Sequence, residues 1–366
     1  MYPALTVADR FAATHDDVVF VGTPNGLEAR LVPEAGVAFR GLKAAGFDRA
    51  RPLTLLTSSG RLAASTVTAW RWLGRMRPDV VLGFGGYVSI PVGFAAALRG
   101  VPLVLHEQNS VPGLANKELS RWAAAVAITY EESAAALAHP DRAVLTGNPV
   151  RPAVLAASRD AGRAALGLPS DSLVLLVFGG SRGARHLNNA VVALRSRLLE
   201  IPGLHVVHVA GATEQATVSA ALAAAGGDGD GRWRVMGYLD DMGSALAASD
   251  LIVARAGATS IAEITALGLP AVLVPYPHAT DDHQTKNAAA MVAHGAAELV
   301  ADSAIDGERF GDTVAGLLRD PARRATMAAA SKGLGRPDAA DRVAALARQA
   351  AEGALRPDGI AYDPKD

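Results

Sequence analysis

The second half of the chain alternates short apolar runs with helical patterns. Six runs rich in aliphatic and β-branched residues are typical of buried parallel strands: SLVLLVF, HVVHV, RWRVM, DLIVA, AVLVP and AELVA. Alanine-rich stretches with helical spacing separate these runs. A strand–helix alternation of this kind predicts a doubly wound, Rossmann-like parallel sheet with helices on both faces.

The first half of the chain follows the same rhythm, except at its start. Its strand-like runs are DVVFVG, VAFRGL, DVVLGFGG, VPLVLHEQ, AVAITY and AVLTGNPV, and a helix is predicted from about residue 59 to 76. The chain opens with a helical pattern, MYPALTVADRFAAT. A doubly wound domain normally begins with a strand that lies in the middle of its sheet, and that strand is missing from this pattern.

The run NPVRP at 148–152 halts regular structure and marks a domain boundary. The predicted fold class is therefore α/β, with two doubly wound parallel-sheet domains that face a cleft. We expect one domain over 1–150 and a second over 151–340. A helix near 341–351 is a candidate to pack back on the first domain, and 352–366 is expected to be a disordered tail.

Composition narrows the class of protein. A chain of 366 residues exceeds the size at which one hydrophobic core usually suffices, and 50% of its residues are hydrophobic. The formal net charge of -1 gives no electrostatic reason to expect a nucleic-acid partner. The absence of cysteine excludes disulfides, cysteine zinc sites and a thiol nucleophile, and fits a cytosolic protein. Since no apolar run approaches the ~18 residues of a membrane span, we expect a soluble protein or one that rests on a membrane surface.

The clearest candidate chemistry lies in RAGATSIAEITALGLPAVLVPYPHATDDHQTKNA, residues 255–288. A helix that begins near Thr259, after a buried strand, offers unpaired N–H groups and a positive dipole end to a diphosphate. Glu263, about one turn later, is suited to accept hydrogen bonds from the two hydroxyls of a ribose. Three side chains past the next strand can read sugar hydroxyls: His283, Gln284 and Asn287. The alternative is a helix cap, an exposed glutamate and a solvated loop, but the ordered combination favours a nucleotide-sugar site.

A dense polar cluster follows another buried strand, in the run HEQNSVPGLANK. Polar side chains at the end of a buried strand are costly to leave unpaired. A packed network and a polar-ligand site would both explain them, and we favour the ligand site. Glycine-rich turns precede two helices, at 85–86 and 179–183, where small residues permit close approach of the backbone to a ligand. Such turns also occur simply as tight connections, so they are a weak signal.

Tryptophans alternate with arginines in the helix that ends near residue 76. Large apolar groups beside arginines suit a helix pressed onto anionic lipid. The alternative is that the tryptophans belong to the core and the arginines form a solvated face. The candidate membrane patch comprises Trp70, Arg71, Trp72 and Arg75.

In their order and spacing, six motifs resemble those of the MurG-type N-acetylglucosaminyltransferases of peptidoglycan synthesis: GFGGYVSIPVGFAA, HEQNSVPGLANK, TGNPVR, FGGSRGA, RAGATSIAEI and HQTKNA. The resemblance runs from Tyr2 to about Asp341. It implies a GT-B fold and inverting transfer of N-acetylglucosamine from UDP-N-acetylglucosamine to undecaprenyl-diphosphoryl-N-acetylmuramyl-pentapeptide, the step from lipid I to lipid II. It also implies a peripheral protein at the cytoplasmic membrane face, with no metal and no other cofactor.

The resemblance assigns roles to residues of both halves. The donor-binding set would be Arg151, Ser181, Ala258, Thr259, Glu263, His283, Gln284 and Asn287. The acceptor side would comprise Gly85, Gly86, Tyr87, Glu107, Gln108, Asn109 and Asn116. His106 is a candidate for the catalytic base, although a histidine beside a buried strand is more often structural.

One departure from the family pattern concerns the start of the chain. The family begins with a strand and a glycine-rich loop ending in a histidine, ahead of the stretch that here is Met1-Tyr2-Pro3. We therefore expect Met1 to be an internal methionine, preceded by on the order of fifteen further residues that supply a strand and its loop. If Met1 is the genuine start, we expect donor binding with little turnover.

Other activities are compatible with parts of the pattern. The chain could be another GT-B glycosyltransferase, for a glycolipid or natural product, or a UDP-sugar epimerase. The HEQN run and the basic tryptophan helix argue against these. A non-catalytic nucleotide-sugar-binding protein is favoured only if Met1 is the genuine start.

Overall fold

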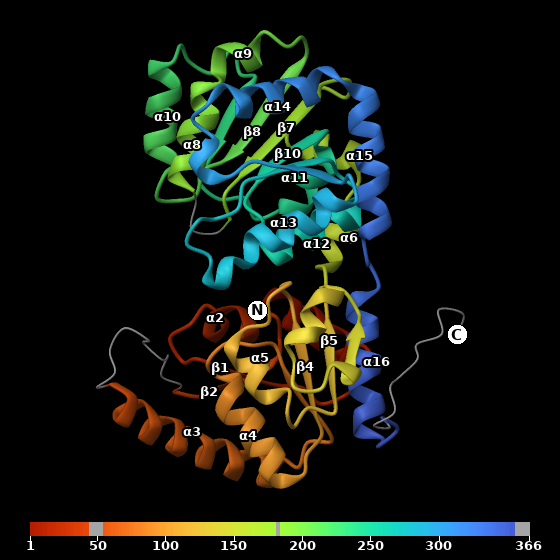
Figure 1. Cartoon of the computed structure of the whole chain (residues 1–366). Coiled ribbons are helices and arrows are strands. Elements are labelled where there is room, and N and C mark those ends of the chain that lie inside the picture. Colours follow the sequence, from red (N-terminus) through yellow and green to blue (C-terminus); the bar gives the residue numbers. More distant parts are fainter. Residues whose placement is uncertain (44–53, 181–183, 356–366) are drawn as a thin grey trace. The chain divides into compact units, whose positions relative to one another are not determined.

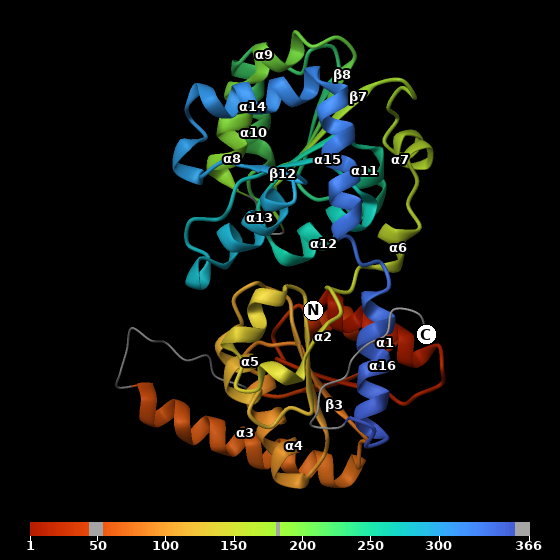
Figure 2. The ribbon, with the colours of Figure 1, turned by 45° about the vertical axis from the view of Figure 1, so that its right-hand side comes forward.

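The computed structural model describes residues 1–43, 54–180 and 184–355, and for 54–59 the backbone only. The chain divides into two compact units, which are shown in Figures 1 and 2. The first unit comprises Met1–Pro149 together with the segment from Asp338, and the second comprises Val150–Pro337. The division lies within the NPVRP run. Each unit is described here by itself.

The second unit is built on one parallel sheet of six strands in the order β12-β11-β10-β7-β8-β9. The strands are β7 (Leu173–Phe178), β8 (Leu204–Val209), β9 (Trp233–Met236), β10 (Leu251–Ala254), β11 (Ala271–Leu273) and β12 (Ala297–Leu299). All six strands predicted from this half are present. The first strand, β7, lies in the middle, and the chain builds outward from it in both directions, as in a doubly wound sheet.

Helices cover both faces of this sheet (Figure 1). They are α6 (Pro152–Leu155), α7 (Arg159–Ala165), α8 (Arg185–Ala193), α9 (Arg195–Leu199), α10 (Gln215–Ala224), α11 (Met242–Ala248), α12 (Ala258–Leu267), α13 (His283–Ala293), α14 (Glu308–Arg319) and α15 (Pro321–Leu334). Leu175 and Val177 of β7 pack in one core with α8, α10 and α14. Leu176 and Phe178 pack in a second core with α11, α12 and α13. Successive side chains of a strand point to opposite faces, so a strand buried on both sides is apolar throughout.

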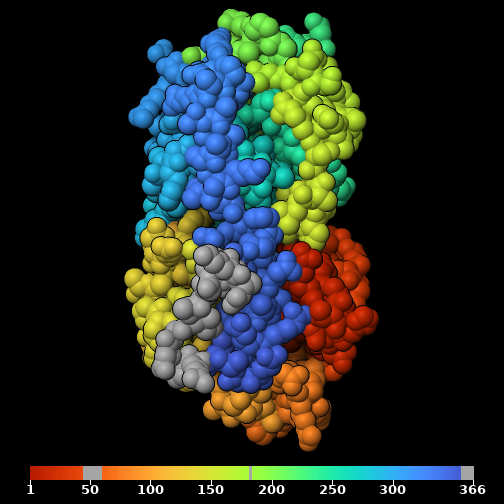
Figure 3. All heavy atoms as spheres, turned by 90° about the vertical axis from the view of Figure 1, so that its right-hand side faces the viewer, coloured from red at the N-terminus to blue at the C-terminus, as the bar shows by residue number. Residues whose placement is uncertain are grey.

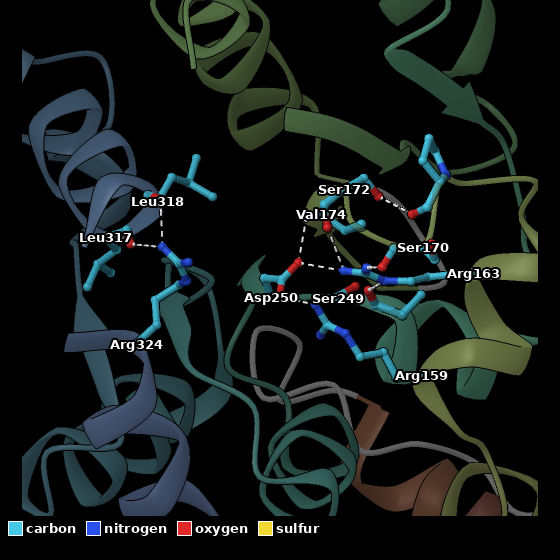
Figure 4. A network of polar contacts seen from close by, with 12 residues as sticks. Arg159, Arg163, Ser170, Ser172, Val174, Ser249, Asp250, Leu317, Leu318 and Arg324 are labelled. Carbon is cyan, nitrogen blue, oxygen red and sulfur yellow. Dashed lines mark hydrogen bonds and ion pairs between the residues drawn. The ribbon is translucent and has the colours of Figure 1, made fainter. Parts of the chain in front are cut away.

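A charged network ties α7 to the amino ends of β7 and β10 (Figure 4). The side chain of Arg163 is only 3% exposed, and its Nη2 lies 3.0 Å from Oδ2 of Asp250. The same carboxylate oxygen accepts a hydrogen bond of 2.8 Å from the backbone N–H of Val174. Arg163 also donates to the carbonyls of Ser172 and Ala248, so this buried charge is well paired.

In the first unit the described strands form two parallel sheets. One contains β1 (Val19–Gly22) and β2 (Ala38–Gly41). The other, in the order β3-β4-β5-β6, contains β3 (Val81–Gly83), β4 (Leu103–Glu107), β5 (Ala125–Ile128) and β6 (Ala143–Leu145). Within the described residues, no strand pairs with both β1 and β3.

Helices of the first unit are α1 (Tyr2–Ala12), α2 (Glu28–Glu34), α3 (Thr54–Met76), α4 (Ser89–Arg99), α5 (Leu114–Leu119) and α16 (Ala339–Ala351). The predicted helix ending at residue 76 is present as α3, and it begins earlier than expected. α16 packs beside α1 and against β4 and β5, and Figure 3 shows the blue C-terminal helix next to the red N-terminal segment. Val343 and Leu346 of α16 share a core with Val7 and Val104. Of the expected tail 352–366, residues 356–366 lie outside the described part of the chain.

Candidate functional site

The strand order of the second unit reverses between β7 and β10, and this is where ligands bind in open α/β sheets. At its carboxyl end, β7 is followed by Gly179 and Gly180, and Gly180 has a φ of 86°, which favours glycine. The predicted donor residue Ser181 lies outside the described residues. β10 ends at Ala254 and leads within four residues into α12.

The N-terminus of α12 presents bare backbone donors at this edge. Its N-cap, Gly257, has no side-chain oxygen, and the first backbone bond of the helix joins the N–H of Ile261 to the Gly257 carbonyl. The N–H groups of Ala258, Thr259 and Ser260 precede that bond, so the helix itself does not satisfy them. Ala258 is buried and Thr259 is half-buried. The turn can therefore bind an anion such as a diphosphate.

Two predicted donor residues, Glu263 and Arg151, contact each other. Nε and Nη2 of Arg151 lie 2.9 and 2.8 Å from Oε1 of Glu263. The Glu263 side chain is 7% exposed, and its burial raises the pKa of the carboxyl group while the arginine opposes that shift. The resemblance placed both residues in the donor-binding set without predicting a contact between them. The structure brings them into one ion pair, even though 112 positions separate them.

Three further predicted donor residues, His283, Gln284 and Asn287, lie in the first two turns of α13. Oε1 of Gln284 accepts a hydrogen bond of 2.9 Å from the N–H of Tyr276. Nδ2 of the fully buried Asn287 donates to the carbonyl of Ala256, 3.3 Å away, and so links α13 to the turn before α12. Nδ1 of His283 lies 2.7 Å from the Thr280 carbonyl and must carry the proton, because a carbonyl only accepts. These side chains thus shape the loops next to the start of α12.

Sequence reasoning gave Arg255 no role, although it stands directly after a buried strand. It is 7% exposed, and its Nη1 donates to the carbonyls of Val274 and Pro275 at 3.2 and 3.0 Å. The same nitrogen lies 2.5 Å from Oδ1 of Asp302. The sequence did hold a signal for this role. A charged residue at the end of an apolar strand is expected to be buried, and a buried charge must find partners.

In the first unit, His106 is enclosed by the protein. It is 1% exposed, and its Nε2 donates to the Gly147 carbonyl at 3.0 Å. Its Nδ1 lies 2.9 Å from Nε2 of Gln108 and therefore accepts. Burial lowers the pKa of His106 to about 4. Both nitrogens are occupied and the ring is neutral, which favours the structural role of this histidine over the catalytic one.

Glu107 organises the HEQN turn from the inside. It is 2% exposed; Oε1 accepts from the N–H of Asn109 at 3.0 Å, and Oε2 accepts from the N–H of Gly113 at 3.0 Å. Nδ2 of the buried Asn116 lies 2.8 Å from the same Oε2. Glu107 and Asn116 therefore hold the turn, whereas Gln108 and Asn109 are only partly buried.

The glycine turn after β3 lies beside this cluster. Gly85 and Gly86 both have a φ of 77°, and a Cβ on Gly85 would be 3.7 Å from Nδ2 of Asn116. Tyr87, the next residue, is 51% exposed. The acceptor-side residues predicted from two separate motifs are therefore neighbours at the carboxyl ends of β3 and β4.

On α3 and α4, aromatic side chains lie among arginines. Trp70 is exposed, and the guanidinium of Arg99 stacks on its ring, 3.8 Å from the centroid. Trp72 is half-buried, packs against the core of the first unit and lies under Arg40. Arg71 and Arg75 are exposed. Leu98 of α4 and Trp122 are also exposed, and Trp122 contacts Phe94 of α4 edge-on.

Comparison with family models places both units in one enzyme family. The model of the glycosyltransferase family 28 N-terminal domain matches residues 1–128, and that of the C-terminal domain matches 174–343. The chain belongs to glycosyltransferase family 28. Its two parallel-sheet α/β units have the GT-B fold of this family.

Curated relatives place this family 28 member in the MurG group. A "UDP-N-acetylglucosamine--N-acetylmuramyl-(pentapeptide) pyrophosphoryl-undecaprenol N-acetylglucosamine transferase" of Desulforudis audaxviator is 42% identical over 94% of the chain and 93% of the relative. A protein of the same name from Salinibacter ruber is also 42% identical, over 94% and 92%. The chain is therefore a glycosyltransferase of the MurG type.

Solved structures agree with this placement. MurG of Acinetobacter baumannii is 28% identical, with a TM-score of 0.75 over 95% of each chain. A UDP-GlcNAc 2-epimerase from Neisseria meningitidis, bound to UDP-GlcNAc, has a TM-score of 0.67 over 94% of this chain and 96% of that one. At 15% identity, the second likeness supports the fold alone.

The described residues lack both a metal-binding cluster and a membrane-spanning helix. They contain no group of three or more histidine and acidic side chains placed to hold a metal ion. In the same part of the chain, no helix combines the length and apolarity that a membrane span requires.

Proposed function

We propose that this MurG-type enzyme transfers N-acetylglucosamine from UDP-N-acetylglucosamine to undecaprenyl-diphosphoryl-N-acetylmuramyl-pentapeptide. The observation that carries the proposal is the uncapped start of α12 together with Glu263, which lies about one turn further along the helix, is buried and is paired with Arg151. This geometry occurs in a chain that is 42% identical to transferases named for that reaction. Another GT-B activity would share the fold but not this degree of similarity.

On the donor side, the diphosphate binds to the bare N–H groups of Ala258 and Thr259, and Ser181 adds a hydroxyl. Glu263 accepts hydrogen bonds from the ribose hydroxyls, because an ionised carboxylate has lone pairs to spare beyond its arginine partner. Gln284 and His283 contact the sugar, whereas the fully buried Asn287 holds the turn before α12 through its bond to the Ala256 carbonyl. As UDP leaves, the α12 dipole and the Arg151 cation stabilise its growing negative charge, so the proposal requires no metal.

On the acceptor side, the muramyl sugar and its diphosphate meet the turn formed by Gly85, Gly86 and Tyr87 and the side chains of Gln108 and Asn109. Glu107 and Asn116 position that turn rather than contact the substrate, because both are buried, Glu107 accepts from the Gly113 N–H, and Nδ2 of Asn116 bonds to Glu107. His106 supports the same turn through Gln108. The base that deprotonates the acceptor hydroxyl is therefore a group other than His106.

The lipid-linked acceptor requires access to a membrane, and the α3–α4 face supplies a suitable surface. Trp70 is an apolar anchor that is exposed, while Arg71 and Arg75 provide positive charge for anionic headgroups. Trp72 supports the helix from inside. We infer that the protein is peripheral and works at the cytoplasmic face of the membrane.

Calorimetric titration with UDP-N-acetylglucosamine, followed by transfer to a lipid-linked muramyl acceptor, tests the proposal. Loss of a charged hydrogen-bond acceptor is worth about 1.5–3 kcal/mol, so Glu263→Gln should weaken donor binding about 10- to 150-fold. Glu298→Gln, on the edge strand β12, is the matched control and should bind like the wild type.

Three outcomes separate the possible activities. Transfer to the muramyl lipid supports the proposal, whereas transfer only to a different acceptor points to another GT-B enzyme. Donor binding without any transfer points to a nucleotide-sugar-binding protein. If Glu263→Gln bound the donor as tightly as the wild type, the assigned ribose contact would be wrong.

A further inference from the structure

A single carboxylate, that of Asp302, joins three segments around the start of α12. Asp302 begins the 3-10 turn Asp302–Ala304, which follows β12. One of its oxygens lies 2.7 Å from Nδ1 of His186, in the first turn of α8, and the other lies 2.5 Å from Nη1 of Arg255. Arg255 in turn binds the carbonyls of Val274 and Pro275 at the end of β11. The network therefore connects α8, the β10–α12 turn and the loop after β11.

His186 also contacts a second carboxylate. Its Nε2 lies 2.9 Å from Oδ2 of Asp306. Ionised carboxylates only accept hydrogen bonds, so an imidazole that bonds to Asp302 and Asp306 together must carry both of its protons. A neutral imidazole has one N–H and can donate to only one of them. The protonated ring is thus the form that ties α8 to both ends of the 302–306 segment.

The charges around this histidine favour its protonated form. The hydrogen bonds with Asp302 and then Asp306 raise the pKa of His186, against a small opposing effect of burial. Burial works against ionisation of Asp302, but its bonds to His186 and Arg255 keep the pKa of that carboxyl below its usual value. The adjacent charge on α8 is Arg185, which is paired with Glu214.

We propose that His186 and Asp302 are positioning residues of the donor site. They hold the first turn of α8 and the turn that begins α12 in the arrangement that binds the diphosphate of a nucleotide sugar. Neither residue needs to touch the substrate, because Asp302 acts through Arg255 and His186 acts through the helix that carries it. The inference rests on the proposed function, which places the donor at this edge of the sheet.

The proposal gives donor binding a dependence on pH. Because the pKa of His186 is raised, its second ion pair is present at low pH and is lost as the pH rises through the pKa of the folded protein. Donor affinity should therefore fall as the pH rises above 6.5, the ordinary pKa of a histidine. The His186 side chain is 38% exposed, so solvent screens its ion pairs. The affinity for the donor should therefore change only about two- to fivefold.

Titration of the full chain with UDP-N-acetylglucosamine at several pH values between 6 and 8.5 is the test. The wild type should lose affinity by that factor across the range. His186→Gln should bind at pH 6 as weakly as the wild type does at pH 8.5, without further change. The matched control, His205→Gln, alters an exposed histidine near the amino end of β8, whose Nδ1 lies 3.3 Å from the Gly203 carbonyl, and it should follow the wild-type profile.

A second variant and a kinetic measurement distinguish positioning from simple loss of stability. Asp302→Asn should weaken donor binding about tenfold, because it removes the partner of both His186 and Arg255. In both variants the KM for the donor should rise while kcat at saturating donor stays unchanged. Wild-type affinity that is constant with pH, or a His186→Gln variant equal to the wild type at pH 6, would overturn the inference. No binding by the wild type at any pH would instead reject the proposed function, and the inference with it.

Discussion

In the unit Val150–Pro337, β7 lies in the middle of a continuous sheet, with β8 on one side and β10 on the other. In the unit that begins at Met1, the described strands form two sheets, and β1 and β3 each have a strand neighbour on one side only. An edge strand leaves a row of backbone groups without partners in its sheet. The continuous sheet should therefore be the more stable scaffold, and it is the one on which the donor site is built.

The two units also differ in how they hold their polar residues. The donor side depends on contacts between residues far apart in the sequence, such as Arg151 with Glu263. The acceptor side depends on a short segment, in which Glu107 bonds to groups at 109, 113 and 116. The donor side should therefore form only when the whole sheet of the second unit is folded. The conformation of the HEQN turn depends mainly on contacts within its own segment.

The largest expected effect comes from Asp250→Ala in the second unit. This change leaves the buried Arg163 without its carboxylate and the N–H of Val174 without an acceptor, at a cost of about 3–5 kcal/mol. The free energy of unfolding should fall, and amide exchange should accelerate in β7 but not in β4. Asp320→Ala, which removes an exposed cap of α15, should cost only about 1 kcal/mol. Equal acceleration of amide exchange in β7 and β4 would contradict the expectation that this change destabilises the second unit alone.

The next largest effect is a loss of stability at acid pH, which is caused by one buried histidine in each unit. Burial lowers the pKa of His106 and of His208 to about 4, from an ordinary value of 6.5. The unfolded chain therefore binds more protons, and the stability that each neutral ring contributes is complete above pH 6.5 and is lost as the pH falls toward 4. Between pH 7 and pH 4.5, protonation of each histidine should lower the free energy of unfolding of the unit that contains it by about 2–3 kcal/mol.

Substitution tests which unit each histidine controls. His106→Gln should reduce the acid sensitivity of the first unit, and His208→Gln that of the second, as measured by amide exchange in β4 and β8. Both variants lose stability at pH 7 because the replaced rings fill buried space, so the slope with pH is the informative quantity. An unchanged slope in either variant would assign the acid sensitivity to other groups.

The smallest effect separates the two tryptophans of α3. Trp70→Ala should weaken binding to vesicles of anionic lipid about three- to tenfold, because it removes an exposed apolar anchor, with little change in stability. Trp72→Ala should instead lower the stability of the first unit by about 1–3 kcal/mol, because this ring packs against the core. Co-sedimentation and urea unfolding distinguish them, and the reverse pattern would refute the assigned membrane face.

Much of the fold was predictable because it depends on local periodicity. All the predicted strands occur in the structure, and the helix predicted at the start of the chain is present as α1. The clustering of the candidate residues was predictable, because polar side chains directly after buried parallel strands lie at one edge of the sheet. Their individual roles were less predictable. His106 and Glu107 point inward to backbone and side-chain partners, and nothing in the run HEQN distinguishes them from Gln108 and Asn109.

The sequence by itself determined the alternation of strands and helices, the two-unit organisation of the chain and the segments that carry polar chemistry. Each of these features follows from the types of residue in a short local stretch of sequence. The tertiary structure alone decided that Arg151 pairs with Glu263, that Asp302 links His186 to Arg255, and which tryptophan of α3 is exposed. These contacts join residues that are distant in the chain, and burial and pairing are properties of the packed whole.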